Sequence, residues 1–342
     1  MARPARWPTC VVADPVLSND RQVTYNFAPP NALQLPLERS SAFGRLQFDL
    51  GPMVRLYADA LYADYSVTQQ LAPTPLFLAF MPRHNPFVPA DLALLLDSRP
   101  DPDSDFNWFK RLSELGPRVA DNDYDVRQFT VGADGYVFLD WHVNVYAQYG
   151  ANQQVQRQFG NALTSRIEEL TFAPDGGEAA CGGFDAFGLG SIPAECAAYI
   201  AADGSNEARA KQWLGEASIE VPLADLPAGE LRAAFGAFHN REEFSYRADP
   251  IATTVLPDGR VDIVGFNASD DIDGDERNTD LYAEVLVPLL SGRPGVHALE
   301  AGFGYRHAEY RAAGGADALK AEFIYRPVAP QRLRGTGRTR PQ

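Results

Sequence analysis

The sequence predicts an all-β fold: a segment of an antiparallel transmembrane β-barrel with about ten strands, an incomplete barrel with long extracellular loops. Three observations predict it. Apolar and polar residues alternate along several segments, and successive side chains of a strand point to opposite faces. Aromatic residues gather near the ends of these segments, and the connections between them alternate between short and long. Such a barrel turns its apolar face to lipid and its polar face to the lumen.

The clearest alternation covers residues 139–149, where odd positions are apolar or aromatic and even positions are mostly polar. The odd row is Leu139, Trp141, Val143, Val145, Ala147 and Tyr149. The same pattern returns at 281–289, 299–305 and 319–325, with Ile324 as the exception on the polar face. We expect strands near residues 23–27, 40–50, 53–67, 124–131, 137–149, 213–223, 230–246, 280–289, 296–310 and 319–326.

The connections form the second pattern. Tight turns are expected at residues 50–52, 133–135, 226–229, 291–294 and 326–327. Long stretches rich in Pro, Gly and Asp cover 68–122, 151–210 and 247–278, with a shorter one at 311–318. Short turns on one side and long loops on the other are typical of outer-membrane barrels. Within the loops, residues 89–96 and 192–200 predict short helices.

Composition excludes several classes of protein. The chain has 342 residues, 45% of them hydrophobic, which is ample for a folded protein. Its net charge of −15 argues against a nucleic-acid partner. No apolar run approaches the roughly 18 residues of a membrane helix. The 5 histidines form no HExxH pair, and no nucleophile elbow or phosphate-binding loop appears, so we expect neither an enzyme nor a cofactor.

Two residue groups could be special sites. Cys181 and Cys196 flank a Gly-rich stretch and predict a disulfide in an oxidising compartment, the alternative being two buried thiols; Cys10 is left over. Acidic residues surround Gly274 in a predicted loop: Asp271, Asp273, Asp275 and Asp280. They match a calcium loop weakly, because Ser269 stands where the first Asp belongs. A solvated acidic loop without metal is the preferred interpretation.

Several stretches resemble TonB-dependent outer-membrane receptors. Loop-like stretches are NPFVPADL (85–92), SRP (98–100), ELGPR (114–118), CGGFDAFG (181–188) and ECAAYI (195–200). Barrel-like stretches are LPAGEL (226–231), AFG (234–236), LYAE (281–284) and PL (288–289). The resemblance covers residues 21–334. It implies a protein of the Gram-negative outer membrane, surrounded by its lipid, for active uptake of a scarce solute such as a siderophore, a saccharide or another nutrient.

The chain departs from that family's plan of signal peptide, TonB-contacting segment, plug and a barrel of about 22 strands. The basic start lacks the apolar core of a signal peptide. We therefore expect an interior fragment: an irregular segment 1–20, a partial barrel 21–334 and a non-native basic tail 335–342. Such a fragment would not transport by itself and would meet the TonB complex only through the missing N-terminal part.

The resemblance implies that the loops bind the ligand. Aromatic rings could stack on it, and arginines could hold an anionic ligand of the siderophore type. The candidates are Arg83, Phe87, Arg99, Trp108, Arg118, Phe184 and Phe187. The alternative is that they only pack the loops together. Other interpretations of the whole chain are a passive porin-like channel, a soluble β-rich binding protein, and a chain that aggregates through its open strand edges.

Overall fold

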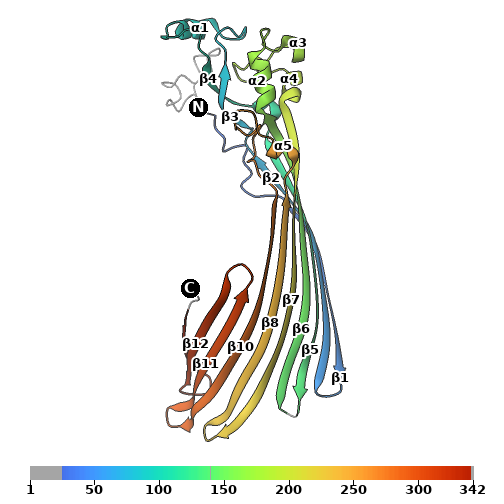
Figure 1. The fold of residues 1–342 in the computed structure, drawn as a ribbon, viewed down its shortest axis with the longest axis vertical. Coiled ribbons are helices and arrows are strands. Elements are labelled where there is room, and N and C mark those ends of the chain that lie inside the picture. The colour runs from blue at the N-terminus through green and yellow to red at the C-terminus, as the bar shows by residue number, and fades with distance from the viewer. Residues whose placement is uncertain (1–24, 139, 340–342) are drawn as a thin grey trace.

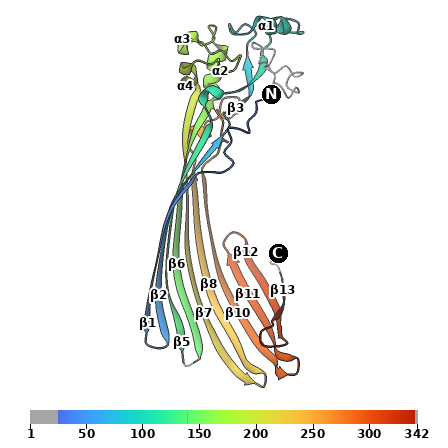
Figure 2. The ribbon, with the colours of Figure 1, turned by 180° about the vertical axis from the view of Figure 1, so that it is seen from behind.

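The computed structural model describes residues 25–138 and 140–339, and one long antiparallel sheet dominates it (Figure 1). Its strands are β1 (Leu37–Leu50), β2 (Val54–Leu71), β5 (Arg118–Val137), β6 (Trp141–Leu163), β7 (Ala201–Leu226), β8 (Gly229–Arg247), β9 (Ile263–Val264), β10 (Ile272–Arg293), β11 (Val296–Tyr310), β12 (Gly314–Arg326) and β13 (Leu333–Arg338). The 11-stranded sheet has the order β1-β2-β5-β6-β7-β8-β10-β11-β12-β13, with β9 beside β6. β1 and β13 do not pair, so the predicted all-β, incomplete barrel wall is confirmed (Figure 2).

The short turns that follow β1, β5, β7 and β10 lie at the lower end of the sheet in Figure 1, whereas the short turn between β11 and β12 lies at the upper end of that hairpin. The turn predicted at residues 133–135 is wrong, because these residues lie inside β5 and pair with residues 54–56 of β2. An Asp-Gly pair is a typical turn signal, but here the ladder hydrogen bonds to both neighbouring strands continue through it. The chain turns instead after Val137, where Phe138 takes a φ of 49°. Leu139 lies outside the described residues.

The strands are longer than predicted. β6 has 23 residues and β7 has 26, whereas a tilted membrane strand needs about 9–11. Much of the chain predicted as loop therefore continues the strands upward. The strand expected at 23–27 is wrong for its described part, since residues 25–27 are irregular. Conversely, residues 335–338 of the predicted tail belong to β13 and pair with β12. The predictions for residues 1–20 and Cys10 lie outside the described residues.

Two long connections fold above the sheet into one compact unit, which we call the cap (residues 72–117 and 164–200; Figure 1). Its elements are β3 (Pro75–Met81), α1 (Ala90–Asp97), β4 (Phe106–Arg111), the 3-10 helix η1 (Ser113–Leu115), α2 (Thr164–Phe172), α3 (Glu178–Cys181) and α4 (Ala194–Ile200). Both predicted loop helices are confirmed as α1 and α4. The third long connection carries α5 (Pro250–Thr253) and β9, which joins it to β6.

Candidate functional site

One face of the sheet exposes a continuous apolar surface. In β6 its row runs from Trp141 through Val145, which is 45% exposed, to Tyr149. Eight residue steps of about 3.3 Å make this row about 26 Å long. Exposed side chains on the same face by register are Leu46, Phe48, Leu56, Tyr62, Phe129, Val131, Trp213, Phe235, Leu281, Phe303, Tyr305, Leu319 and Phe323. Soluble monomers rarely expose an apolar patch of this extent.

The apolar band is inclined to the strands. Val145, midway along the row in β6, is aligned through two intervening strands with Leu281 of β10. The apolar row of β10 covers residues 281–289, and its middle is Val285, four residues beyond Leu281. That offset is about 13 Å along the strand, and three strand spacings cover about 14 Å. The strands therefore tilt about 40° from the normal to the band, as in closed membrane barrels.

Aromatic side chains mark the upper limit of the band, and charges begin directly beyond it. Phe129, Tyr149 and Trp213 are in register on adjacent strands, and the Tyr149 and Trp213 ring centres lie 5.5 Å apart. The next row upward on this face contains Arg127, Ala151, Lys211, Glu243 and Asp275. Rings of this kind favour the boundary between hydrocarbon and water.

The opposite face is polar, and many of its charged side chains have partners. Glu216 accepts hydrogen bonds from the hydroxyls of Tyr146 at 2.8 Å and Tyr282 at 2.7 Å. Asp280 is fully buried and bonded to Arg306. Further pairs are Arg45–Asp59, His142–Asp134, Lys320–Glu284 and Arg334–Glu322. These four ion pairs and the Asp280–Arg306 pair join opposite charges, whereas the Glu216 carboxylate is bonded to two neutral hydroxyls.

Amide side chains continue the polar face toward the cap. Asn122 accepts from Gln154 at 3.1 Å and from Gln156 at 2.9 Å, and Gln158 donates to Gln156 at 2.7 Å. Below them, Gln128 donates to Gln148. Tyr65 and Tyr124 stack beside this network with ring centres 4.4 Å apart. The upper polar face is therefore lined mainly by neutral hydrogen-bonding groups.

Glycines make room for tyrosine rings on this face. A Cβ on Gly132 would lie 2.5 Å from the Tyr57 ring, and one on Gly236 would overlap the Tyr282 ring. Each ring therefore lies flat over the neighbouring strand, an arrangement that stabilises strand glycines. These tyrosines and Glu216 are the polar-face residues that the sequence interpretation did not single out. The signal was present as Tyr and Gly at matching polar positions of adjacent predicted strands.

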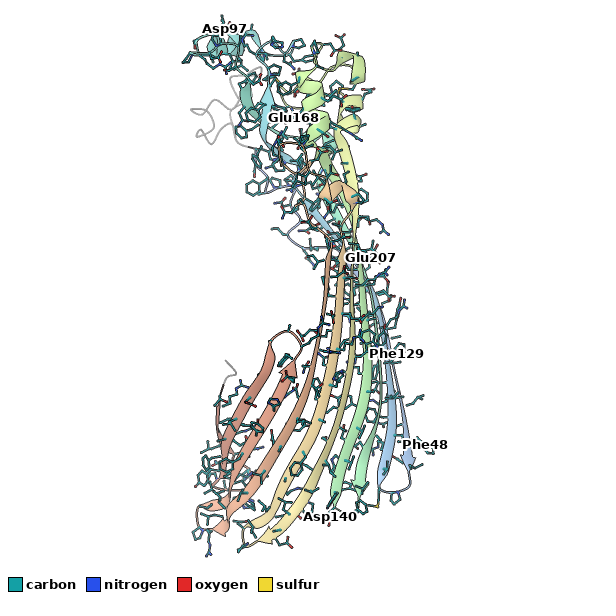
Figure 3. The ribbon with its side chains drawn as sticks, viewed as in Figure 1. Phe48, Asp97, Phe129, Asp140, Glu168 and Glu207 are labelled. Atoms are coloured by element: carbon teal, nitrogen blue, oxygen red, sulfur yellow. A yellow bond between two sulfur atoms is a disulfide. The ribbon has the colours of Figure 1, made fainter. Side chains whose placement is uncertain are left out.

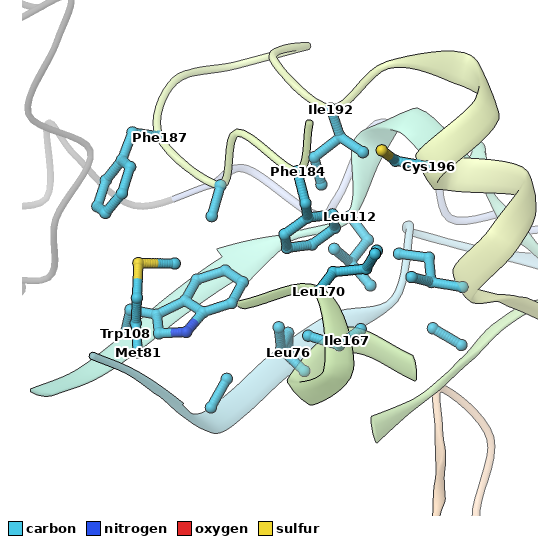
Figure 4. Close-up of a cluster of buried hydrophobic side chains, with 14 of the residues drawn as sticks. Leu76, Met81, Trp108, Leu112, Ile167, Leu170, Phe184, Phe187, Ile192 and Cys196 are labelled. Atoms are coloured by element: carbon cyan, nitrogen blue, oxygen red, sulfur yellow. The ribbon is translucent and has the colours of Figure 1, made fainter. Parts of the chain in front are cut away.

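The cap has its own hydrophobic core (Figure 4). Phe184 is fully buried, and its ring centre lies 6.3 Å from that of Trp108. Ile167 and Leu170 of α2 are buried in the same cluster. Cys181 and Cys196 form a disulfide that closes the second connection, with a sequence separation of 15. The two connections thus form one packed unit at the upper end of the sheet.

The predicted ligand aromatics all contribute to this packing. Trp108 is 2% exposed and Phe187 is 8% exposed, both within the core together with Phe184. Phe87 packs against the core and lies over Gly176 and Gly183. The structure therefore gathers the four rings, but into the interior of the cap. Ligand contact by them stays a prediction that would require the cap to open.

The predicted ligand arginines likewise have protein partners. Arg83 forms a bidentate pair with Asp97, which raises the pKa of Arg83 and lowers that of Asp97. Arg99 donates to the carbonyls of residues 96, 102, 104 and 105. Arg118 donates to the carbonyls of Ala72 and Gly265, and burial lowers its pKa. Arg118 lies at the base of the cap, away from the other two.

Most of the acidic cluster lies in a strand rather than a loop, which corrects the expectation for Asp273, Asp275 and Asp280, while Asp271 precedes the strand. β10 begins at Ile272, so Asp273 and Asp275 point to one face and Asp280 to the other. Asp273 pairs with Arg247 at 2.8 Å, and Asp275 pairs with Arg311. Asp271 bonds to the backbone amide of Ala248. Within residues 25–138 and 140–339, no group of three or more His, Cys, Asp or Glu side chains could hold a metal ion.

In the same described ranges, no helix is both long enough and apolar enough to cross a membrane.

Comparison with known proteins finds similarity among solved structures. No protein-family model matches the chain, and no curated protein matches it. The chain is similar to the crystal structure of the ferric-catecholate import receptor Fiu from E. coli K12 in its open form, with 9% identity and a TM-score of 0.39. The match covers 89% of this chain and 46% of that receptor, so the chain spans less than half of its length. A likeness this low carries no argument of its own.

Proposed function

We propose that this chain forms part of the wall of an outer-membrane β-barrel that takes up a small molecule, as the barrel of a TonB-dependent receptor does. The apolar band carries the proposal. It is about 26 Å long along β6, is crossed by strands tilted about 40°, and ends in aromatic rings. Lipid would cover this band, and the polar face behind it would line a hydrated lumen.

The two ends of the wall would then face different compartments. Short turns are typical of the periplasmic side and long connections of the cell surface. Figure 3 shows Asp140 at a lower turn, and Asp97 and Glu168 in the cap at the opposite end. The cap would meet the solute first, because binding residues concentrate in connections held by a rigid scaffold. Energy coupling through TonB would involve parts of a complete receptor beyond this wall.

Cysteine labelling tests the membrane orientation. In a Cys10→Ser background, Asp101→Cys places a thiol in the exposed part of the cap, and Asp140→Cys places one in a lower turn. A membrane-impermeant maleimide should label position 101 in intact cells and position 140 only after the outer membrane is permeabilised. Equal labelling of both positions in intact cells, or recovery of the chain in the soluble fraction, would contradict the proposal.

Uptake measurements separate active transport from a passive channel. Cells that carry this wall within a complete receptor should lose uptake of siderophores, saccharides or other candidate solutes when a protonophore dissipates the energy for TonB. A passive porin-like channel would keep its uptake under the same treatment. Uptake that the protonophore leaves unchanged would therefore contradict the TonB-dependent part of the proposal. It would not contradict the part that assigns the chain to a barrel wall.

A further inference from the structure

Two arginines at the base of the cap carry their charges near one another without an acidic partner. Arg111 is the last residue of β4, and Arg118 is the first residue of β5. Among the described residues, neither guanidinium has a carboxylate within 4.0 Å. Arg83 differs because it has an acidic partner, whereas Arg99 and Arg166 are held by backbone carbonyls.

Most donors of this pair have no acceptor. Arg111 Nη1 donates to the Pro73 carbonyl at 2.7 Å. Arg118 Nε donates to Ala72 at 3.0 Å, and its Nη1 donates to Gly265 at 2.5 Å. Each guanidinium has five N–H groups, so the majority remain without a partner in the described part of the chain. None of these nitrogens is among the buried atoms that lack a partner. The nitrogens without any partner, Arg111 Nε and Nη2 and Arg118 Nη2, are therefore not fully buried.

The surroundings of the pair are neutral and partly closed. The Arg111 guanidinium lies 5.1 Å from the centre of the Tyr25 ring, and that of Arg118 lies 5.6 Å from the Phe266 ring. Burial lowers the pKa of both arginines, and the charge of Arg111 lowers that of Arg118 further. Two like charges in such a setting are costly unless an anion compensates them.

A buried, unpartnered amide lies next to the same junction. Asn161 is fully buried, and its Nδ2 has no hydrogen-bond partner within the described residues. Its Oδ1 accepts the backbone N–H of Phe266 at 2.9 Å, the residue whose ring faces Arg118. The start of β5, the end of β6 and the third long connection therefore meet here with donors in excess of acceptors.

We propose that Arg111 and Arg118 together bind one oxyanion, a phosphate or a carboxylate group, at the base of the cap. The planar guanidinium presents paired N–H groups that match the oxygens of both kinds of group. The carbon of each guanidinium lies over a ring face, and most of the N–H groups have no acceptor within the described residues. The anion would connect the first long connection to the third one, which Arg118 already contacts through Gly265. This site does not depend on the transport proposal.

Calorimetric titration of the full chain folded in detergent tests the site. Potassium phosphate and potassium acetate are each added at constant ionic strength set with potassium chloride. We expect saturable binding of one oxyanion per chain, weakened about tenfold or more by Arg111→Gln. Arg111→Lys keeps the positive charge but loses the planar guanidinium with its paired N–H groups, so it should bind the oxyanion with intermediate affinity. Tighter phosphate binding would indicate a free inorganic ion, and tighter acetate binding would indicate the carboxylate of an organic ligand.

The controls separate binding from folding. Arg157→Gln changes an exposed arginine of β6, whose partner is Asp123, and should leave the affinity unchanged. Near-ultraviolet circular dichroism verifies that the cap of each variant is folded. Arg111 is varied rather than Arg118 because Arg118 also joins two segments of the chain. The absence of saturable binding by either oxyanion, or equal binding by the parent and Arg111→Gln, would overturn the proposal.

Discussion

Lys110 and Glu114 form an ion pair inside the cap, with Lys110 Nζ 3.2 Å from Glu114 Oε1 and side chains only 5% and 8% exposed. Lys110 Nζ also donates to the Gly188 carbonyl at 2.7 Å. The pair therefore joins the first connection to the second one. The spacing of four residues carries no signal for this contact, because Lys110 lies in β4 and Glu114 in η1, so no single helix brings them together.

Lys110→Met should destabilise the cap by about 3–5 kcal/mol, because it leaves a buried carboxylate without its counter-charge. Hydrogen exchange of the α2 and α4 amides measures this local stability. The double variant Lys110→Met with Glu114→Leu removes both charges and should recover most of the loss. If the single and the double variant exchange at the same rate, the ion pair is not what holds the connections together.

Phe184→Ala should cost the cap about 3–5 kcal/mol, since it leaves a cavity beside Trp108. Phe77→Ala is the matched control, because Phe77 is 63% exposed on the neighbouring β3. Its loss should change cap stability by less than about 1 kcal/mol. Denaturant unfolding followed by Trp fluorescence compares the two variants. Equal effects would mean that the core in Figure 4 is not the packed centre of the cap.

The cap should lose stability in acid partly through Asp175. Hydrogen bonds from the amides of Ala179 and Gly177 hold the pKa of Asp175 below its ordinary value. Its contribution is therefore present above the unfolded pKa of about 3.9 and is lost as the pH falls through the lower folded value. Thermal midpoints measured between pH 3 and 7 should fall below about pH 4, and less steeply in Asp175→Asn. Parallel curves for the parent and the variant would contradict this role.

Sequence reasoning found the strands only where one face is apolar. Residues 141–149 alternate cleanly because one face of the sheet is apolar there and the other is polar, which is the condition for a period of two. The upper part of β7 lacks this contrast: Arg209 and Lys211 lie on one face, and Gln212 and Asn206 lie on the other. With both faces polar, residues 201–212 resemble a loop in sequence although they are paired strand.

The cap was harder to predict, for a different reason. Trp108 and Phe184 meet across 76 residues of sequence, and no local pattern indicates such a contact. Aromatic residues in long loops were therefore interpreted as ligand contacts, whereas the structure uses them as core. The pair Arg111 and Arg118 shows the same limit, since their missing acidic partners become visible only when the surrounding chain is in place.

Two adjacent residues of β6 test the two faces of the sheet directly. Val145 lies on the apolar face and Asn144 on the polar face, so Val145→Lys and Asn144→Lys introduce the same charge one residue apart. If lipid covers the apolar face, Val145→Lys should destabilise the folded wall by about 2–4 kcal/mol near the middle of the band. Asn144→Lys should have a much smaller effect, because its ammonium stays in the hydrated polar layer. Urea unfolding in lipid vesicles, followed by the loss of heat-modifiable migration on gels, measures both. A larger loss of stability in Asn144→Lys than in Val145→Lys would reverse the assignment of the faces. Equal small losses of stability would mean that neither face is in contact with lipid.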